Sequence, residues 1–272
     1  MTDRLLEALS QGVVTYDLGR PLFSGMPQSP NHPKYTHTLA RRHGDIMRSD
    51  GSSAANDLIV TGTHVGTHID ALAHVSFGGC LYDGSSASEA QLGGRFMGLG
   101  VHTISPLITR GVLLDVPSAL GLDVCEPGYE ITPGDLEATL GHHKLEPRPG
   151  DVVLVRSGWA RRFDVEGDSY VGRDTGVPGV SEAGATWLAN FAPLAVGADS
   201  IAFERLAPGK GHDLLPAHRV LLVERGIYIM EAMNFEEIAA AEVHEFTFVA
   251  IPLRLVGATG SPIRPVALIA RD

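Results

Sequence analysis

The sequence predicts an α/β protein in which helices flank a mixed central sheet. Three short, continuous apolar runs, at 111–116, 151–156 and 194–198, have the length and composition of buried strands. A capped helical segment precedes each of the last two runs, and this helix-then-strand alternation is typical of helices layered on a sheet. The 272 residues contain no internal repeat and no break in composition, so we expect a single domain over 1–272.

The first quarter of the chain predicts a helix, a strand and then a long irregular segment. Three leucines share one face of a helix over 2–11, and 13–17 forms a short strand. Residues 19–57 are rich in Pro, Gly, Ser and His. Irregular segments of this length are usually binding loops, lids or disordered segments. We expect a long loop here, and a surface loop without a role in the site is the alternative.

Capping signals and apolar runs predict the remaining elements. Thr132 and Asp135 form a capping-box pattern that begins a helix, and Ser181 caps a second helix. Asp115 lies inside an apolar strand, where we expect it to have a structural role as a salt-bridge partner. The other expected elements are a helix over 216–226, a strand over 227–230, a helix from Asn234 to about 244, strands over 246–255 and 263–269, and a turn between these two strands.

The composition excludes several classes of partner. The net charge of −11, without any basic run, argues against nucleic acid and against an anionic membrane surface. The two cysteines, Cys80 and Cys125, lie far apart and predict neither a disulfide framework nor a sulfur-ligated zinc site. The N-terminus lacks the apolar core of a signal peptide, and no run of about 18 uncharged apolar residues occurs. We therefore expect a cytoplasmic protein.

The stretch Gly62–His74 concentrates the residue types that bind metals. His64, His68, Asp70 and His74 all fall at even positions, and even positions of an extended strand share one face. The β-branched residues between them disfavour a helix. The pattern predicts an extended run that aims two imidazoles and a carboxylate at one point. Ligands of this kind suit zinc, manganese or iron(II).

Two other interpretations of this stretch are open. A helix with His64 and His68 at i and i+4, as in zinc proteases, is the weaker one because of the β-branched content. A hydrogen-bonded structural cluster without a metal is the other. Burial of one polar group without partners costs roughly 2–7 kcal/mol, so three histidines and an aspartate on one parity favour the metal site.

His218 and Glu231 form a second set of candidate residues. His218 lies near the start of the predicted helix and Glu231 follows the next strand, 13 residues further on. A helix that folds back on a strand brings two such positions together. This spacing does not identify a site by itself.

The run HVGTHIDALAH at 64–74 resembles the H-x-G-T-H-x-D-x-P-x-H signature of the cyclase-like metal-dependent hydrolases. This family includes bacterial-type kynurenine formamidase and isatin hydrolase. Segments 151–159 and 215–222, Glu231 and the tail IPLRLVGATGSPIRPVALIA fit the family in order, so the resemblance covers nearly the whole chain. It implies a swivelling β/β/α fold and a homo-oligomer, either a dimer or a tetramer. Leu72 stands where the family usually has proline.

The resemblance also implies a site with one or two Zn²⁺ or Mn²⁺ ions per subunit. The implied ligands of the first ion are His64, His68 and Asp70, with Asp70 bridging to a second ion held by His218 and Glu231. His74 matches the catalytic general acid and base. The formamidase branch has an aromatic residue in its early M-P-x-W-P segment, whereas this chain has Ser29 there, which points away from N-formylkynurenine as substrate.

The expected activity is hydrolysis of an amide, lactam or related acyl bond by metal-activated water. An imidazole has an unperturbed pKa of ~6.5, so the ring of His74 is a candidate to take a proton from water and return it to the leaving nitrogen. We expect residues 19–57 to cover the site, and Phe23, Met26 and Phe77 to line a pocket for a small molecule.

Two alternatives belong to other functional classes. A non-haem iron(II) oxygenase uses two histidines and one carboxylate as a facial triad. A non-catalytic metal-binding or ligand-binding protein needs the same ligands but no proton shuttle. A covalent nucleophile is not expected, because the chain has no G-x-S-x-G motif and neither cysteine lies in a catalytic motif.

Overall fold

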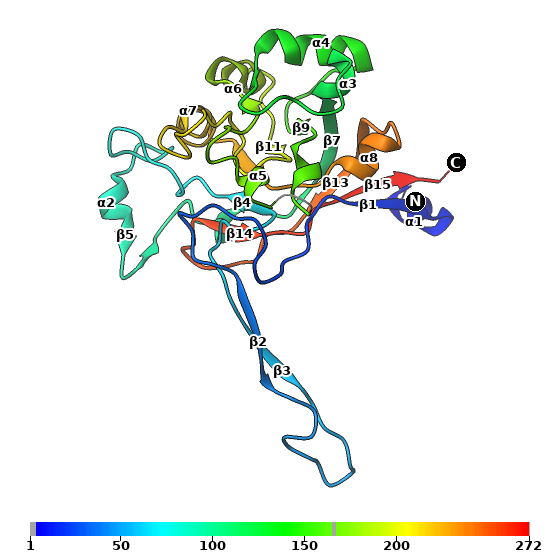
Figure 1. The fold of residues 1–272 in the computed structure, drawn as a ribbon, viewed down its shortest axis with the longest axis vertical. Helices are drawn as coiled ribbons and strands as arrows, with labels where there is room; N and C mark the ends of the chain where they lie inside the picture. Colours follow the sequence, from blue (N-terminus) through cyan, green and yellow to red (C-terminus); the bar gives the residue numbers. More distant parts are fainter. Residues whose placement is uncertain (1–3, 165–166, 272) are drawn as a thin grey trace.

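A nine-stranded mixed sheet forms the centre of the structure, a computed structural model that describes residues 4–164 and 167–271 (Figure 1). In spatial order its strands are β1 (Val13–Asp17), β15 (Val266–Ala270), β13 (Glu245–Ala250), β7 (Leu107–Asp115), β9 (Val152–Arg156), β11 (Ala195–Ala198), β12 (Tyr228–Glu231), β4 (His68–Asp70) and β14 (Gly260–Pro262). Strands β7, β9, β11 and β12 run parallel, and the strands on both sides of them pair antiparallel.

Helices and three small strand pairs complete the fold. The small pairs are β2 (Thr36–Arg41) with β3 (Asn56–Val60), β5 (Gln91–Leu92) with β6 (Arg95–Phe96), and β8 (Glu130–Ile131) with β10 (Gly179–Val180). The helices are α1 (Arg4–Gln11), α2 (Ala87–Ala90), α3 (Val116–Leu120), α4 (Pro133–His143), α5 (Gly167–Val171), α6 (Glu182–Ala189), α7 (Pro216–His218) and α8 (Glu236–Ala240), with 3₁₀ turns at Val101–Thr103 and Trp159–Arg162 and a π-type continuation of α7 at Arg219–Arg225. None of the described helices is long and apolar enough to cross a membrane.

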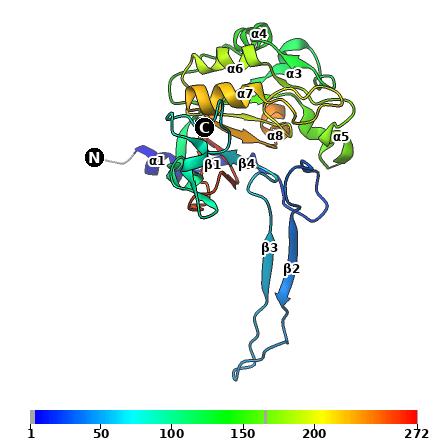
Figure 2. The same ribbon diagram turned by 90° about the vertical axis from the view of Figure 1, so that its left-hand side faces the viewer.

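The sheet separates two apolar cores. Helices α3, α4, α6 and α7 cover one face (Figures 1 and 2). Side chains alternate along a strand, so Val153 and Val155 of β9 pack toward these helices, while Val152 and Leu154 join the core on the other face. Full burial of each such side chain contributes roughly 1.5–3 kcal/mol. The continuous apolar strands of the sequence are therefore the strands that have a core on both sides.

The predicted capping signals locate two helices correctly. Thr132 and Asp135 form the capping box at the start of α4, and the Ser181 hydroxyl accepts a hydrogen bond from the Gly184 amide at the start of α6. The helix predicted over 2–11 is α1, whose residues 2 and 3 lie outside the described residues.

The C-terminal elements differ from the prediction. The helix expected to reach about 244 ends at Ala240, and the strand expected over 246–255 ends at Ala250. Residues 251–256 leave the sheet as a loop. The expected turn after them contains β14, which pairs with β4. A strand edge left open needs a partner, and this three-residue strand supplies it for β4.

The segment 19–57, expected as one loop over the site, divides into two parts. Residues 19–35 are irregular and stay on the body of the protein, whereas β2 and β3 form a hairpin that projects away from it (Figures 1 and 2). The expectation is therefore wrong for the hairpin, which points away from the site. The hairpin has no buried apolar face, so the period-two pattern that reveals strands is missing from the sequence.

Asp115 has the structural role expected for it. It ends β7, and its carboxylate accepts a hydrogen bond from Nη1 of Arg156 at 2.8 Å. The same guanidinium donates from Nε and Nη2 to Glu236 at 2.9 and 3.0 Å. Asp115 and Arg156 are both buried. This ion pair joins two parallel strands to α8.

The substitution Arg156→Met is expected to lower the free energy of unfolding by about 3 kcal/mol, because it leaves a buried carboxylate without its partner. Urea denaturation measures the change. Arg161→Met is the matched control, since Arg161 contacts the same Glu236 from a half-exposed position at 2.5 Å and a surface pair contributes about 0–1 kcal/mol. Equal losses in the two variants would contradict the role given to Arg156.

Candidate metal centre

The pairing of β4 with β12 brings two predicted residues face to face. In this antiparallel pair His68 lies opposite Glu231, and Asp70 lies opposite Ile229. His68 and Asp70 are two residues apart on β4 and so point to the same side of the sheet. All three polar side chains are buried at this position. The register of one strand pair therefore assembles half of the predicted site.

His64 reaches the site through a tight turn rather than along an extended strand. The extended conformation predicted for 62–74 is correct only for 68–70, and Gly66 has a left-handed φ of +68°. A Cβ on Gly66 would lie 2.2 Å from the Leu22 side chain, and one on Gly260 would lie 2.5 Å from the His64 ring. The turn at Gly66 and the bare backbone at Gly260 let the ring pack against the sheet. The even spacing predicted that His64 and Asp70 lie close together. It did not predict the turn at Gly66 that brings them there.

α7 supplies His218 from the helical layer above β12. Its backbone N–H and ring Nδ1 both contact the carboxylate of Glu204, a buried residue that sequence analysis missed. The Nδ1 of His68 likewise contacts the Gly66 carbonyl oxygen at 2.8 Å. A partner at Nδ1 holds the proton on that nitrogen and leaves Nε2 free to bind a metal. Both rings are therefore set for ligation through Nε2.

Four side chains form a closed ring of contacts in which histidines and carboxylates alternate. The Nε2 of His68 is 3.4 Å from Asp70 Oδ1 and 3.5 Å from Glu231 Oε2. The Nε2 of His218 is 3.4 Å from Asp70 Oδ2 and 3.3 Å from Glu231 Oε1. These separations exceed the usual N–H···O range of about 2.7–3.2 Å. Each carboxylate turns one oxygen toward His68 and the other toward His218, and one donor atom each of His68, Asp70 and Glu231 lies within 4.8 Å of the other two, close enough to hold a metal ion together.

The oxygen atoms of Asp70 support this fit. Asp70 is completely buried, yet its Oδ2 has no hydrogen-bond partner in the described part of the chain. A buried, unsatisfied carboxylate oxygen is costly unless a cation or hydrogen bond compensates it. Its Oδ1 contacts the Nδ1 of His64 at 2.6 Å, and His64 Nε2 contacts the Thr259 hydroxyl at 2.8 Å. The two oxygens of the Asp70 carboxylate thus face different histidines, Oδ1 facing His64 and His68 and Oδ2 facing His218.

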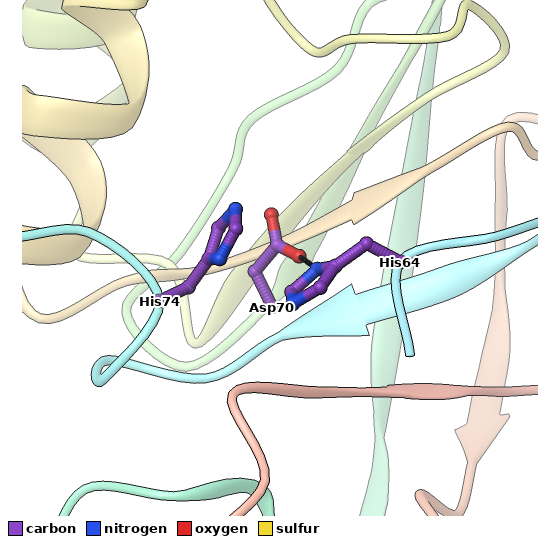
Figure 3. A group of neighbouring side chains, drawn as sticks. All are labelled: His64, Asp70 and His74. Atoms are coloured by element: carbon purple, nitrogen blue, oxygen red, sulfur yellow. Dashed lines mark hydrogen bonds and ion pairs between the residues drawn. The ribbon is translucent and has the colours of Figure 1, made fainter. Parts of the chain in front are cut away.

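The His74 ring stacks on the His64 ring with centroids 3.9 Å apart, and both rings lie beside the carboxylate of Asp70 (Figure 3). Its ring makes no hydrogen bond to the residues that the structure describes. Burial lowers the pKa of His74 to about 3, against the opposing charge of Asp70. The ring is therefore neutral at pH 7 and has a nitrogen free to accept a proton.

The carboxylates of the ring stay ionised. Burial alone would raise the pKa of each, but the interactions with the neighbouring imidazoles, those of His74 and His64 above all, hold the pKa of Asp70 well below its ordinary value. The charge of His218 and its hydrogen bond likewise lower the pKa of Glu231. At neutral pH the site therefore offers two negative ligands in a buried position.

The imidazoles of the ring bind protons tightly when no cation competes. Burial lowers the pKa of His68, but the close carboxylates of Asp70 and Glu231 outweigh it and raise that pKa to about 10. The pKa of His218 is raised well above its ordinary value by the charges of Glu204 and Glu231, again against burial. Protons thus occupy the places that a divalent cation would take.

A cavity of about 170 Å³ opens onto these residues. His32 and His212, which sequence analysis missed, lie in its wall, and neither ring makes a hydrogen bond within residues 4–164 and 167–271. The other lining residues are Pro27, Gln28, Ser29, Asn31, His64, Gly66, His68, His74, Tyr170, Ile201, Leu215, His218, Glu231 and Ala232. Both missed histidines belong to irregular segments rich in Pro and Gly, where no periodicity marks them.

The three apolar residues predicted for the pocket do not line this cavity. Met26 is buried in a core cluster with Phe163, and Phe23 packs edge-on against the same ring at 6.4 Å. Phe77 is exposed beneath the guanidinium of Arg219. The prediction that these three side chains line the pocket is therefore wrong. Core packing places Met26 and Phe23 elsewhere, and Phe77 contacts a surface cation. Within 19–57, the part that reaches the cavity is 27–32.

Comparisons with known proteins give one consistent family. The family model described as putative cyclase matches residues 16–205. Cyclase-like protein 3 of Oryza sativa is 27% identical over 80% of this chain and 67% of its own length, and the isatin hydrolase of Roseibium aggregatum is 25% identical over 82% and 78%. A crystal structure of a novel cyclase has a TM-score of 0.85 and 29% identity, over 98% of this chain and 93% of the other.

The apparent affinity for Zn²⁺ or Mn²⁺ is expected to rise with pH between about 6 and 8.5. His68, with its pKa raised to about 10, and His218, with its pKa raised likewise, are protonated in the metal-free protein, and a metal must displace these protons. One to two protons released correspond to about tenfold to hundredfold per pH unit. Calorimetry in buffers of different ionisation enthalpy counts the protons. A pH-independent affinity would contradict ligation by these imidazoles.

Glu204→Gln is expected to weaken metal binding by about 10- to 100-fold without unfolding the protein, because it disturbs the partner that orients His218. Competition with a chromophoric chelator measures the affinity, and circular dichroism monitors the fold. Glu182→Gln is the control, since this exposed carboxylate contacts Arg219 on the same helical segment but lies outside the ring. Unchanged affinity in Glu204→Gln would show that Glu204 does not position His218.

Proposed function

We propose that this chain, which belongs to the putative cyclase family, is a metal-dependent hydrolase of amide, lactam or related acyl bonds. The observation that carries the proposal is the buried ring of His68, Asp70, His218 and Glu231 with a neutral His74 beside it. A ring of this kind is suited to bind a cation, and the adjacent neutral imidazole of His74 can carry a proton during a reaction.

The ring residues would hold a divalent cation, and Asp70 has oxygens on two sides for one ion or two. His64 and His68 both contact the Oδ1 side of Asp70, His218 contacts the Oδ2 side, and Glu231 lies between His68 and His218. Nitrogen and oxygen donors suit both Zn²⁺ and Mn²⁺. When bound, the cation supplies a Lewis acid that polarises a carbonyl and lowers the pKa of water toward ~7.

His74 is the proposed proton carrier. It lines the cavity and stands next to Asp70 without a hydrogen bond of its own in the described residues, so its ring is available to a water molecule and to a leaving group. A neutral imidazole accepts the proton of the attacking water. The imidazolium that results lies beside the carboxylate of Asp70, which stabilises it until the proton passes to the leaving nitrogen.

The cavity favours a compact substrate with polar groups. Its volume of about 170 Å³ is small, and Tyr170, Ile201 and Leu215 supply its apolar part. The rings of His32 and His212, which make no hydrogen bond to the described residues, offer hydrogen bonds to a second carbonyl or to the carboxylate that hydrolysis creates. An aromatic amide, formylated or cyclic, matches this combination of one flat apolar part and adjacent carbonyls.

Two relatives support hydrolysis as the reaction class. The protein similar to this chain in Roseibium aggregatum is named isatin hydrolase, and the one in Sphingopyxis alaskensis, 22% identical, is named kynurenine formamidase. Isatin is a cyclic amide and the formamidase substrate is an N-formyl amine, so both reactions break a carbon–nitrogen bond. The small Ser29 in the cavity wall, where the formamidase branch has an aromatic residue, favours the cyclic amides for this chain.

His74→Ala is expected to retain metal and to lose turnover by about 10²- to 10⁴-fold, the usual contribution of a general acid–base group. The assay uses protein purified without chelator and a panel of N-formyl anilines, cyclic imides, isatin-like lactams and lactones, with elemental analysis of each variant. His102→Ala is the control, because His102 is bonded to the Gly257 amide and lies outside the cavity lining.

Three outcomes would contradict the proposal. Loss of metal together with turnover in His74→Ala would make His74 a ligand. Turnover that depends on dioxygen would favour an iron(II) oxygenase with the same residues. Normal ligand binding without turnover of any member of the panel would favour a non-catalytic binding protein.

A further inference from the structure

The run 64–74 contains one buried polar side chain that neither metal ligation nor proton transfer explains. Thr67 is 2% exposed and stands immediately before His68. A threonine hydroxyl donates one hydrogen bond and can accept others, and its burial without partners would be costly. The partners of this hydroxyl therefore indicate its role.

The Thr67 hydroxyl links two segments that are far apart in the sequence. It donates a hydrogen bond to the backbone carbonyl oxygen of Ala232 at 2.7 Å, and it accepts one from the backbone N–H of Arg20 at 2.9 Å. Both hydrogen bonds are buried. In a buried chain of this kind each hydrogen bond polarises the next and strengthens it. One hydroxyl thus holds two backbone groups in place.

The bond to Ala232 continues the pairing that opposes two ligands of the ring. Thr67 precedes His68 on β4 and Ala232 follows Glu231 on β12, and the register of the two strands ends with His68 opposite Glu231. Thr67 and Ala232 are the next positions along the two strands. A side-chain hydrogen bond therefore joins the strands where the backbone ladder stops, directly beside the two ligands.

Ala232 needs this support because its backbone is strained. Its φ of +52° lies in the left-handed region, which residues with a side chain adopt rarely. Such residues persist where the surrounding contacts hold them. The Ala232 N–H donates to the carbonyl oxygen of Ser200 at 2.9 Å, and its own carbonyl oxygen accepts from Thr67. These two bonds fix the conformation of the chain directly after Glu231.

The bond from Arg20 connects the ligand strand with the segment that forms the cavity wall. Arg20 lies at the start of the irregular segment 19–35, part of which lines the cavity. Its buried guanidinium donates to the carbonyl oxygen of Ala160 at 2.6 Å and lies 4.3 Å above the Phe163 ring. The backbone of Arg20 is therefore well anchored, and the Thr67 hydroxyl is held from both sides.

We propose that Thr67 is a positioning residue of the metal centre. Its hydroxyl fixes the backbone beside His68 and beside Glu231, so that these two ligands keep their separation of 3.5 Å before a cation arrives. Ligands that are already in place do not have to be ordered on binding, which raises affinity. This role rests on the metal centre of the proposed function, and Thr67 acts through the backbone rather than as a ligand.

Thr67→Val tests this role, because it removes the hydroxyl and keeps the β-branched shape of the side chain. Competition with a chromophoric chelator measures the dissociation constant for Zn²⁺, which is expected to rise by about 10- to 100-fold, as for other groups that orient metal ligands. Thr67→Ser keeps the hydroxyl and is expected to restore most of the affinity. Circular dichroism monitors the fold of each variant.

Thr139→Val is the matched control. Thr139 is also buried, and its hydroxyl also donates to a backbone carbonyl oxygen, that of Asp135 at 2.7 Å, but it lies on α4 in the helical layer. Both valine variants are expected to unfold at a lower urea concentration than the wild-type chain. Only Thr67→Val is expected to lose affinity for Zn²⁺, because a purely structural hydrogen bond contributes to stability alone.

Deuterium exchange of the wild-type chain gives a result that does not depend on how the variants fold. Saturating Zn²⁺ is expected to slow the exchange of the Arg20 amide, since this amide donates to the hydroxyl that joins the ligand strands. The Gly184 amide is the control, because it donates to the Ser181 hydroxyl at the start of α6, outside the site. Its exchange is expected to slow by a smaller factor.

The outcomes separate the role of Thr67 from the metal centre itself. Wild-type affinity in a folded Thr67→Val variant, an equal loss of affinity in Thr67→Ser, or equal slowing of the two amides would each overturn the positioning role and leave the metal centre intact. A wild-type chain that binds no Zn²⁺ at neutral pH would overturn both. Binding is measured without substrate, so the result holds whichever amides the protein hydrolyses.

Discussion

The carboxylate of Asp70 is the constraint on which the site depends. Asp70 is carried by β4, between β12 and β14, and is completely buried. Histidines contact both of its sides, and its Oδ2 has no hydrogen bond in the described chain. A buried charge of this kind is tolerated only when opposite charges surround it. The positions of His68, His64 and His218 are thus consequences of one buried negative group, as well as the means of binding a cation.

The sheet provides the rigidity that such a site requires. β4 lies between β12 and β14, and both pairings fix its register, so His68 and Asp70 cannot shift without loss of ladder hydrogen bonds. The helical layer brings His218 from above, and Glu204 holds its ring in place. Ligands carried on strands and on a packed helix keep their spacing more exactly than ligands carried on loops. The irregular 27–32 and the segment with His212 instead shape the cavity.

The β2–β3 hairpin and the site differ in what they bury. The body buries its polar groups in a closed cluster, whereas the hairpin leaves apolar side chains exposed on both faces. Residues 19–35 lead from the cavity wall into the hairpin, so the two belong to one continuous segment of the chain.

The sequence by itself determined the α/β class, the main strands and the membership of the central run in one site. These depend on local signals: apolar runs give β7, β9 and β11, capping residues give α4 and α6, and the spacing of His64, His68, Asp70 and His74 gives the candidate cluster. The resemblance of 64–74 to a family signature added His218 and Glu231, which spacing alone did not identify.

Only the tertiary structure decided how these residues meet. The turn at Gly66, the register that sets His68 against Glu231, and the support of His218 by Glu204 all depend on pairings between distant segments. Likewise the pocket residues His32 and His212, and the projecting β2–β3 hairpin, come from segments without periodicity. A local pattern records which face of an element is buried. It carries no record of the distant partner that buries it, because that partner is chosen by packing across the whole chain.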